Sequence, residues 1–419
     1  MTSCTVLYRT IRYGGEDIDD YNVFPTYDFK DNNNKFFFEK SNSNLVDTLN
    51  INWKYNNCKF DNLDSLLKTT TTRAFLVIKN DSIIYENYLR GYKKEDFSTV
   101  FSVSKSVTSL LIGIAIDEGY VSSVNDPVKK YISELKSADP MFEKLTIKDL
   151  LDMRSGIKFK EDYGLNPFSK IARLYYGTNQ LSQIRKLHFE CEPGTKYNYQ
   201  SISTAILGVI IEKSTHQSFA EYFEEKVWKP LGMENDGKWS LDDKKNKSAK
   251  AFGGLSISAI DLAKIGRLYL NEGKWNGKQI ISKGWIHETL TPKLQNDEYQ
   301  NQWYSFSAAG VDSAGNRYFN DSISAQKQWE SKYCKKYPFH EVIKIRKTDY
   351  KRKYRKKYWQ FDTDYKWILK IYTEQYYALG IMKQILFIDP KKNTIFVRLG
   401  DDSDLEDYTS LFYKINSKL

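Results

Sequence analysis

The chain has 419 residues, of which 41% are hydrophobic, 28% charged and 15% aromatic, with 22 glycines and 9 prolines. This composition excludes a disordered or collagen-like protein, and the length suffices for a large domain of two parts with a sizeable core. Lys and Arg total 63 against 53 Asp and Glu, and the resulting formal charge of +10 favours an anionic partner such as nucleic acid or an acidic surface.

The start of the chain allows two interpretations. Met1-Thr2-Ser3-Cys4 resembles the end of a bacterial lipoprotein signal, whose cysteine becomes the acylated first residue, and the alternative is an ordinary start with a chance cysteine. Residues 1–70 are polar and rich in Asn and Asp, which predicts an N-terminal extension with little regular structure.

Regular elements are predicted from residue 74. Residues 74–88 hold two apolar, β-prone runs around the turn pair Asn80-Asp81, which predicts a β-hairpin. From Ser102 the apolar residues recur every three or four positions until Gly119, which predicts a buried helix with a glycine C-cap.

The rest of the chain alternates between helical and strand patterns. Helices are predicted at 146–153, 201–213, 219–227 and 257–272, a second hairpin at 376–399 around the turn 389–393, and a closing helix after residue 402. Strands at both ends with helices between them predict an α/β fold, in which an antiparallel sheet built from both chain ends is flanked by helices and carries a mostly helical insertion.

This fold class divides the chain into four parts. They are the N-terminal extension (1–70), an α/β sheet domain (71–145, 250–300 and 371–419), a helical domain (146–249) and a basic, aromatic-rich insertion (301–370).

The positive charge is concentrated in that insertion. Between Gln326 and Lys370 lie 15 Lys/Arg and 5 Asp/Glu, a difference of ten that equals the net charge of the whole chain. Basic and aromatic residues alternate at 350–359, a pattern that suits an anionic surface or polymer. The alternative is a solvated excursion whose aromatic rings pack on the main domain.

Ser102-Val103-Ser104-Lys105 is the first chemical motif. A residue three positions along a helix faces the same side, so the Lys105 amine can reach the Ser102 hydroxyl and activate it as a nucleophile. The same Ser-x-x-Lys spacing occurs elsewhere, but only this copy opens a long apolar helix after a hairpin. A Ser N-cap with an incidental lysine is the structural alternative.

An ordered set of motifs resembles the class C β-lactamase-related serine hydrolases, which include penicillin-binding-protein-like peptidases, esterases and 6-aminohexanoate-dimer hydrolases. The matching stretches cover about 70–290 and 375–419 and run in this order: Phe101-Ser102-Val103-Ser104-Lys105-Ser106, Asp126-Pro127-Val128, Pro193-Gly194-Thr195, Tyr199-Gln200-Ser201, Pro230-Leu231-Gly232-Met233 and Gly253-Gly254-Leu255.

The resemblance implies roles for further residues. Tyr199, with Ser201, stands at the family's Tyr-x-Asn/Ser motif, and its phenol is expected to act as general acid and base. Gly380 and Ile381 stand at the third motif, where the Ile381 amide is expected to complete an oxyanion hole with the Ser102 amide. That motif lacks the family's usual Lys or His, which weakens any expectation of carboxylate recognition. Lys383 nearby is an alternative source of this charge, although a solvated lysine is expected there.

These residues predict a serine hydrolase that acts on a small-molecule or peptide-like amide or ester through an acyl-enzyme, without a metal or organic cofactor. The alternatives are a non-catalytic binding protein of the same fold and an anionic-polymer or membrane binder acting through the basic insertion. A Ser-His-Asp triad is not favoured, because no Gly-x-Ser-x-Gly elbow is present and His188 alone is expected near the cleft. The resemblance favours the cell envelope or periplasm, with lipidation at Cys4 as one route, and the cytoplasm is expected otherwise.

Overall fold

A computed structural model describes residues 2–31, 33–42, 45–137, 139–162, 166–292, 298–309, 318–346, 365–402 and 407–419. The alternating basic and aromatic stretch at 350–359 lies outside the described residues. In the part of the chain that is described, no helix has the length and apolarity needed to cross a bilayer.

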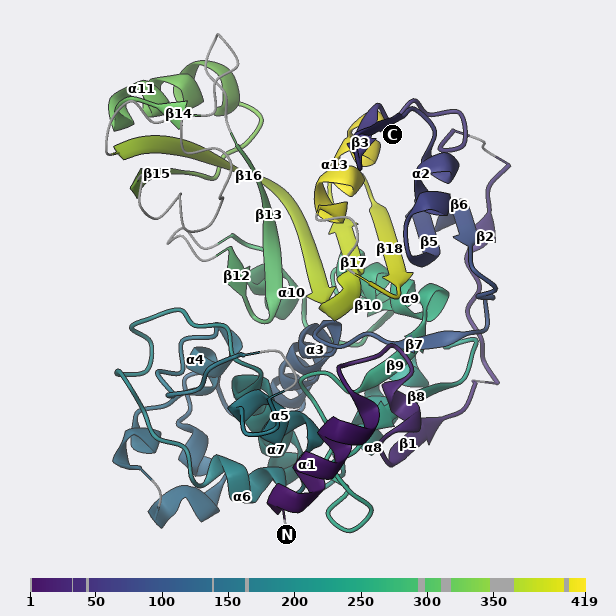
Figure 1. The fold of residues 1–419 in the computed structure, drawn as a ribbon. Helices are drawn as coiled ribbons and strands as arrows, with labels where there is room; N and C mark the ends of the chain where they lie inside the picture. Colours follow the sequence, from purple (N-terminus) through teal and green to yellow (C-terminus); the bar gives the residue numbers. More distant parts are fainter. Residues whose placement is uncertain are drawn as a thin grey trace.

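The main sheet joins the two ends of the chain, as predicted (Figure 1). All its neighbouring strands are antiparallel except the β2–β6 pair. The strand order is β12 (Tyr299–Gln300), β13 (Trp303–Ala309), β16 (Tyr365–Gly380), β17 (Gln384–Asp389), β18 (Thr394–Gly400), β5 (Thr72–Lys79), β6 (Ser82–Tyr88) and β2 (Glu39–Lys40).

The first predicted hairpin is confirmed as β5 and β6. Lys79 pairs with Ser82, and Asn80 and Asp81 between them both have positive φ, at 51° and 61°. Asn and Asp tolerate this conformation, which suits the tight two-residue turn of a twisted hairpin.

The second predicted hairpin is confirmed as β17 and β18, but the long run before its turn is not one strand. The chain leaves β16 at Gly380, makes a short 3₁₀ turn at Ile381–Lys383 and re-enters the sheet as β17. Met382 and Lys383 both have φ of 59° there. The expectation of an uninterrupted strand over 376–388 is therefore wrong.

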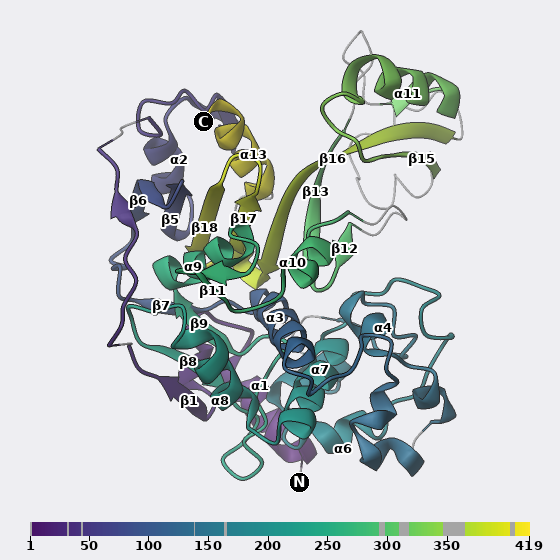
Figure 2. The ribbon, with the colours of Figure 1, turned by 180° about the vertical axis from the view of Figure 1, so that it is seen from behind.

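Helices cover both faces of this sheet (Figure 2). Helix α9 (Ala259–Leu270) packs on β5, β17 and β18, with Gly266 against Leu386 and Ile395. Helices α2 (Leu63–Thr69) and α13 (Tyr408–Lys418) cover the opposite face, where Phe412 contacts the rings of Phe75, Phe387 and Phe396. The two faces thus bury separate apolar clusters.

The helical part lies below the sheet in Figure 1 and packs around α7 (Ser201–Thr215). Its other elements are α3 (Val103–Asp117), α4 (Ile147–Leu151), α5 (Lys170–Tyr176), α6 (Gln180–Ile184), α8 (Phe219–Phe223) and short 3₁₀ or π turns at Val128–Lys130, Ser133–Ser137, Pro140–Glu143 and Glu224–Trp228. Helix α3 ends at the predicted glycine, since Gly119 has φ of +80°.

The N-terminal extension is more regular than predicted. It contains α1 (Thr2–Tyr13), a 3₁₀ turn (Asp20–Asn22), β1 (Thr26–Phe29), β2, β3 (Trp53–Tyr55) and β4 (Cys58–Phe60). Strand β1 joins a second sheet in the order β1, β8 (Gly237–Ser240), β9 (Leu255–Ser258) and β7 (Phe97–Thr99). The expectation of little regular structure is wrong, because polar Asn-rich turns here separate short elements that the folded domain completes.

Residues of the basic insertion form a lobe that projects from one end of the sheet (Figure 1). The first half of β16 pairs with β15 (His340–Arg346) and β14 (Tyr318–Phe319), and α11 (Ser322–Gln328) continues into a π turn (Trp329–Tyr333). A small apolar cluster of Phe319, Ala325, Leu369 and Ile371 holds the lobe together.

The remaining elements follow α9 in the chain. They are β10 (Lys274–Trp275), β11 (Lys278–Gln279) and α10 (Lys283–Thr289).

Candidate functional site

Ser102 lies at the N-terminal end of α3, where β16 and β17 reach the helical part (Figure 1). The residue before it, Phe101, is buried and has φ of 47°, so the chain turns sharply just before the serine. The amide of Val103 donates to the carbonyl of Val100 at 3.1 Å and closes this turn. The turn leaves the Ser102 side chain half-buried at the helix end.

Lys105 lies one helical turn further along and contacts Ser102. Its side chain is 1% exposed, and Nζ donates to Ser102 Oγ at 2.8 Å and to the carbonyl of Phe252 at 2.9 Å. Burial lowers the pKa of the Lys105 amine to about 8, against the opposing effect of the Glu161 carboxylate. Near neutral pH a fraction of the molecules therefore has a neutral Lys105 amine in contact with the Ser102 hydroxyl.

Tyr199 approaches the same pair from the loop before α7. Its hydroxyl hydrogen-bonds with Ser102, and its ring centroid lies 5.2 Å from Lys105 Nζ. Burial raises the pKa of the Tyr199 phenol well above its ordinary value, although the bond with Ser102 acts the other way. The phenol thus keeps its proton at neutral pH and can donate it.

Gln200 fixes the direction of Tyr199. Its buried amide accepts from Ser155 Oγ at 3.1 Å and donates to the carbonyls of Ile157 at 2.8 Å and Phe159 at 2.7 Å. These bonds tie the Tyr199 loop to the segment that follows α4. The middle residue of the Tyr-x-Ser motif is therefore a structural anchor.

Ser201 does not contact Ser102 through any described hydrogen bond and instead binds a carboxylate. Its Oγ donates to Glu161 Oε1, and its amide donates to Glu161 Oε2 at 3.1 Å. The charge of Glu161 also acts on Lys105 and Tyr199. Sequence reasoning missed Glu161, since it stands in an irregular segment with no motif around it.

Tyrosines form one wall beside Tyr199. Tyr299 meets the Tyr199 ring edge-on at 5.6 Å, and Tyr304 lies stacked on Tyr377 with centroids 5.0 Å apart. Tyr299 and Tyr304 belong to β12 and β13, and Tyr377 belongs to β16. In a chain with 31 tyrosines, no sequence signal separates these from the rest.

The predicted third motif lies directly against the serine turn. A Cβ on Gly380 would come within 2.3 Å of the carbonyl oxygen of Val100, so only glycine allows this approach. Ile381 follows in the 3₁₀ turn. The structure therefore brings Gly380 and Ile381 beside the segment that carries Ser102.

Two buried side chains hold this turn. Arg398 donates to the carbonyls of Met382 and, at 3.2 Å, Lys383. The Gln384 amide donates to the carbonyl of Gly400 at 2.6 Å and accepts from the Gly400 amide at 3.1 Å. The hydrogen bonds of Arg398 and Gln384 hold Met382 and Lys383 in their positive-φ conformation.

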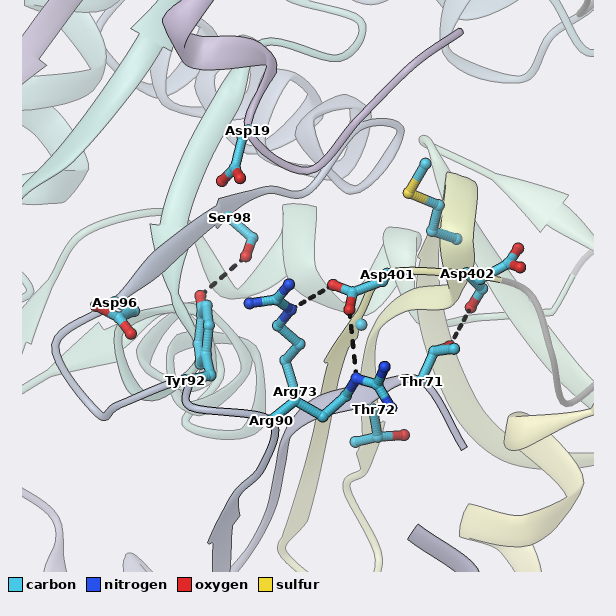
Figure 3. A network of polar contacts seen from close by, with 12 residues as sticks. Asp19, Thr71, Thr72, Arg73, Arg90, Tyr92, Asp96, Ser98, Asp401 and Asp402 are labelled. Carbon is cyan, nitrogen blue, oxygen red and sulfur yellow. Dashed lines mark hydrogen bonds and ion pairs between the residues drawn. The ribbon is translucent and has the colours of Figure 1, made fainter. Parts of the chain in front are cut away.

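An ion-pair network continues from the end of β18 (Figure 3). Arg73 Nε donates to Asp401, and Arg90 Nε lies 3.7 Å from the other oxygen of the same carboxylate. Thr71 Oγ1 donates to the carbonyl of Asp402 at 3.4 Å. This network ties the start of β5 and the chain after β6 to the segment that follows β18.

His188, the histidine expected near the cleft, faces Asp139 at 3.6 Å and is 79% exposed. Among the residues that the structure describes, no group of three or more His, Cys, Asp or Glu could hold a metal ion. Ser102, Lys105 and Tyr199 together supply a hydroxyl, an amine and a phenol.

Known proteins share this fold and sequence pattern. A model of the beta-lactamase family matches residues 47–314. The 6-aminohexanoate-dimer hydrolase of Paenarthrobacter ureafaciens is 27% identical over 274 residues, which cover 59% of this chain and 67% of that protein.

Two solved structures are similar over most of the chain. A provisionally assigned 6-aminohexanoate-dimer hydrolase from Bacillus anthracis has a TM-score of 0.68 at 21% identity and covers 97% of this chain and 93% of its own. A penicillin binding protein from Bacillus halodurans has a TM-score of 0.55 at 14% identity, with 85% and 99% covered. At these identities the structural matches show the fold alone. The family match spans more than half of the chain and confirms the resemblance, so this protein belongs to the beta-lactamase family of serine hydrolases.

Proposed function

We propose that the protein cleaves an amide or ester bond through an acyl-enzyme on Ser102. The observation that carries this proposal is the 2.8 Å contact between Lys105 Nζ and Ser102 Oγ, made by an amine whose pKa burial lowers to about 8. A serine hydroxyl needs an adjacent base to become a nucleophile, and this amine is in position to be that base.

Acylation follows from the positions of the three side chains. Neutral Lys105 takes the Ser102 proton as Oγ attacks the substrate carbonyl, and the carbonyl π electrons move to its oxygen. The backbone amides of Ser102 and Ile381 stabilise that oxyanion. The close approach of Gly380 to Val100 supports this role, because it brings Ile381 beside the segment that carries Ser102. As the intermediate collapses, Tyr199 protonates the leaving amine or alcohol and regains a proton from Lys105.

Deacylation reverses the same steps with water. Water attacks the acyl carbonyl and gives a proton to neutral Lys105. As the intermediate collapses, the released Ser102 Oγ takes a proton from Tyr199, which regains one from Lys105. The acid product then leaves. Ser102 contacts both Lys105 and Tyr199, and Lys105 Nζ lies 5.2 Å from the Tyr199 ring centroid.

The charges around the site favour an acyl donor without a carboxylate at the reacting centre. Glu161 places a negative charge near Lys105 and Tyr199, and the third motif carries no Lys or His. A like charge in the substrate would be repelled there. The related 6-aminohexanoate-dimer hydrolase is named for a dimer of 6-aminohexanoate. For this protein we propose an amide or ester that is neutral or carries an amine near the cleaved bond.

The experiment compares Ser102→Ala with Ser65→Ala. Ser65 is exposed and has the same spacing to Lys68, so it controls for the motif without the site. Ser102→Ala should abolish p-nitrophenyl ester turnover and labelling by a fluorophosphonate, while Ser65→Ala keeps both. Unchanged labelling of Ser102→Ala would overturn the assignment. Tight ligand binding with no turnover in a broad ester and amide panel would instead support the non-catalytic alternative.

A second function is proposed for the lobe: binding of an anionic polymer. Cations lie over aromatic rings there, with Lys344 Nζ 4.1 Å from the Tyr365 ring centroid and 5.7 Å from that of Trp367. Such paired surfaces bind phosphate backbones and stack on bases. Lys344 and Arg346 stand two residues apart on β15, and both are exposed.

Single-stranded DNA at several salt concentrations tests this second function. The double variant Lys344→Glu and Arg346→Glu should weaken binding at least about tenfold and flatten the salt dependence. The same change at Lys54 and Lys59, exposed on the β3–β4 hairpin, is the control and should have little effect. Binding to anionic vesicles without DNA binding would contradict the polymer and favour a membrane surface.

A further inference from the structure

A cavity of about 300 Å³ lies on the helical part, between α1, α5, α6 and the start of α7. Its lining residues include Val6 and Leu7 from α1, Arg173 from α5, Gln183 from α6 and Ile202 from α7. This volume is at the lower end of the range for small-molecule sites. The N-terminal extension therefore completes a hollow that the family motifs do not describe.

Apolar side chains form most of the lining of this cavity. Val6, Phe159, Leu187 and Ile202 line it and are themselves buried side chains of the core, Ile202 being 1% exposed. An apolar chain that enters would replace water with hydrocarbon contacts.

The mouth of the cavity carries exposed apolar side chains. Phe168 is 67% exposed and Leu7 is 40% exposed, and both line the cavity. Soluble proteins leave few such large side chains together on one surface unless a ligand or partner covers them.

Cations surround the same mouth. Lys170, Arg173 and Lys186 line the cavity with exposed side chains, and among the described residues none of them forms an ion pair with a carboxylate. Partial burial lowers the pKa of the Lys170 amine, as do the charges of Lys158 and Arg173, while Glu190 acts the other way. A positive rim around an apolar interior is complementary to an anion that carries a hydrocarbon chain.

We propose that this cavity binds a single-chain amphiphile with an anionic head, such as a medium-chain carboxylate. The chain occupies the apolar interior beside Phe159 and Ile202, Phe168 covers it, and the head group binds at Arg173 and Lys186. This site does not include Ser102, and the proposal does not rest on the proposed hydrolase.

The cavity wall is continuous with the loop that holds Tyr199. Ile202 follows Ser201 directly, and the carbonyl of Phe159 accepts from the Gln200 amide at 2.7 Å. An occupant would therefore stiffen the two segments that position Tyr199 and Glu161.

Calorimetric titration of the full chain tests the site with sodium decanoate, below its micelle concentration. Saturable binding of one decanoate per chain is expected, weaker at high salt. Decyltrimethylammonium has the same chain with a cationic head and should bind at least about tenfold more weakly. Acetate, which has the head without the chain, should not bind. Equal binding of the two decyl compounds would overturn the assignment of the head group to the cationic rim.

Variants locate the binding at this cavity. Phe168→Glu, and separately Arg173→Gln with Lys186→Gln, change exposed side chains and should each weaken decanoate binding at least about tenfold. Ile323→Glu, at an apolar side chain of similar exposure on the lobe, and Lys278→Gln are the matched controls and should leave it unchanged. The proposal would be overturned if decanoate bound with unchanged affinity to Phe168→Glu and to the double variant Arg173→Gln with Lys186→Gln. It would also be overturned if decanoate bound only in the presence of anionic vesicles.

Discussion

Replacing Lys105 by methionine should inactivate the protein and stabilise it. The Lys105 amine is 1% exposed, and burial lowers its pKa from 10.5 to about 8. At roughly 1.4 kcal/mol per pH unit, holding this amine charged at pH 7 costs the folded state about 3 kcal/mol. Methionine fills a similar volume without charge but loses the bonds to Ser102 and Phe252, each worth about 1 kcal/mol. A net gain of about 1 to 2 kcal/mol in unfolding free energy remains.

Urea denaturation of wild type and Lys105→Met at pH 7 measures this gain. The folded pKa lies below the unfolded value, so the unfolded chain binds more protons between about pH 8 and 10.5. Wild-type stability should therefore rise with pH in that window through this residue, and the advantage of the variant should shrink. Ester turnover should fall about 10²- to 10⁴-fold, as expected when a general base is removed.

Lys264→Met is the matched control. Lys264 is also fully buried, but its Nζ lies 2.9 Å from Asp261, and its removal leaves that buried carboxylate without a cation. This variant should lose about 3 to 5 kcal/mol of stability. If Lys105→Met is less stable than wild type at pH 7, or if both variants lose the same amount, burial of the charged Lys105 amine does not destabilise the folded state.

Further predictions concern the pH profile and the glycine at the third motif. The Glu161 charge raises the pKa of the buried Lys105 amine, so Glu161→Gln should move the rising limb of the kcat/KM pH profile from near pH 8 to lower pH. Ser201→Ala keeps the Glu161 charge and should keep this limb in place. A limb that stays or moves to higher pH in Glu161→Gln would contradict this electrostatic role. Gly380→Ala places a Cβ 2.3 Å from the carbonyl oxygen of Val100, so the turn must shift and kcat for the ester should fall about 100-fold. Gly284→Ala, which has open space around the new Cβ, should retain the wild-type kcat. Equal kcat in the two variants would contradict the close approach of Gly380 to Val100.

Local patterns predicted much of the fold, because they are set by residues close in sequence. The two apolar runs around Asn80-Asp81 and the three-to-four spacing after Ser102 specify a hairpin and a helix whatever surrounds them. The strands within the N-terminal extension could not be predicted, because they depend on distant partners, such as Trp239 opposite Tyr27. Polar turns between such strands look like unstructured chain.

The site was predictable only where a motif carried it. Ser102 and Lys105 share a helix, so their spacing already implied contact. Glu161 reaches Ser201 from 40 residues away, a pairing that only the folded chain creates. The break after Gly380 also escaped prediction, because it depends on the buried Arg398 that holds the turn. Site residues that are brought together only by tertiary contacts have no local sequence pattern that predicts them.

Intact-mass measurement of the protein during turnover of a p-nitrophenyl ester shows whether Ser102 is acylated. We expect a transient adduct with the mass of one acyl group, located by peptide mapping on Ser102, and no adduct in Ser102→Ala. Since Tyr199 is placed to protonate the leaving group and to assist water, Tyr199→Phe should turn over slowly with the adduct on the same serine. Steady turnover with no adduct under rapid quench, or an adduct that maps to another residue, would show that Ser102 is not the nucleophile.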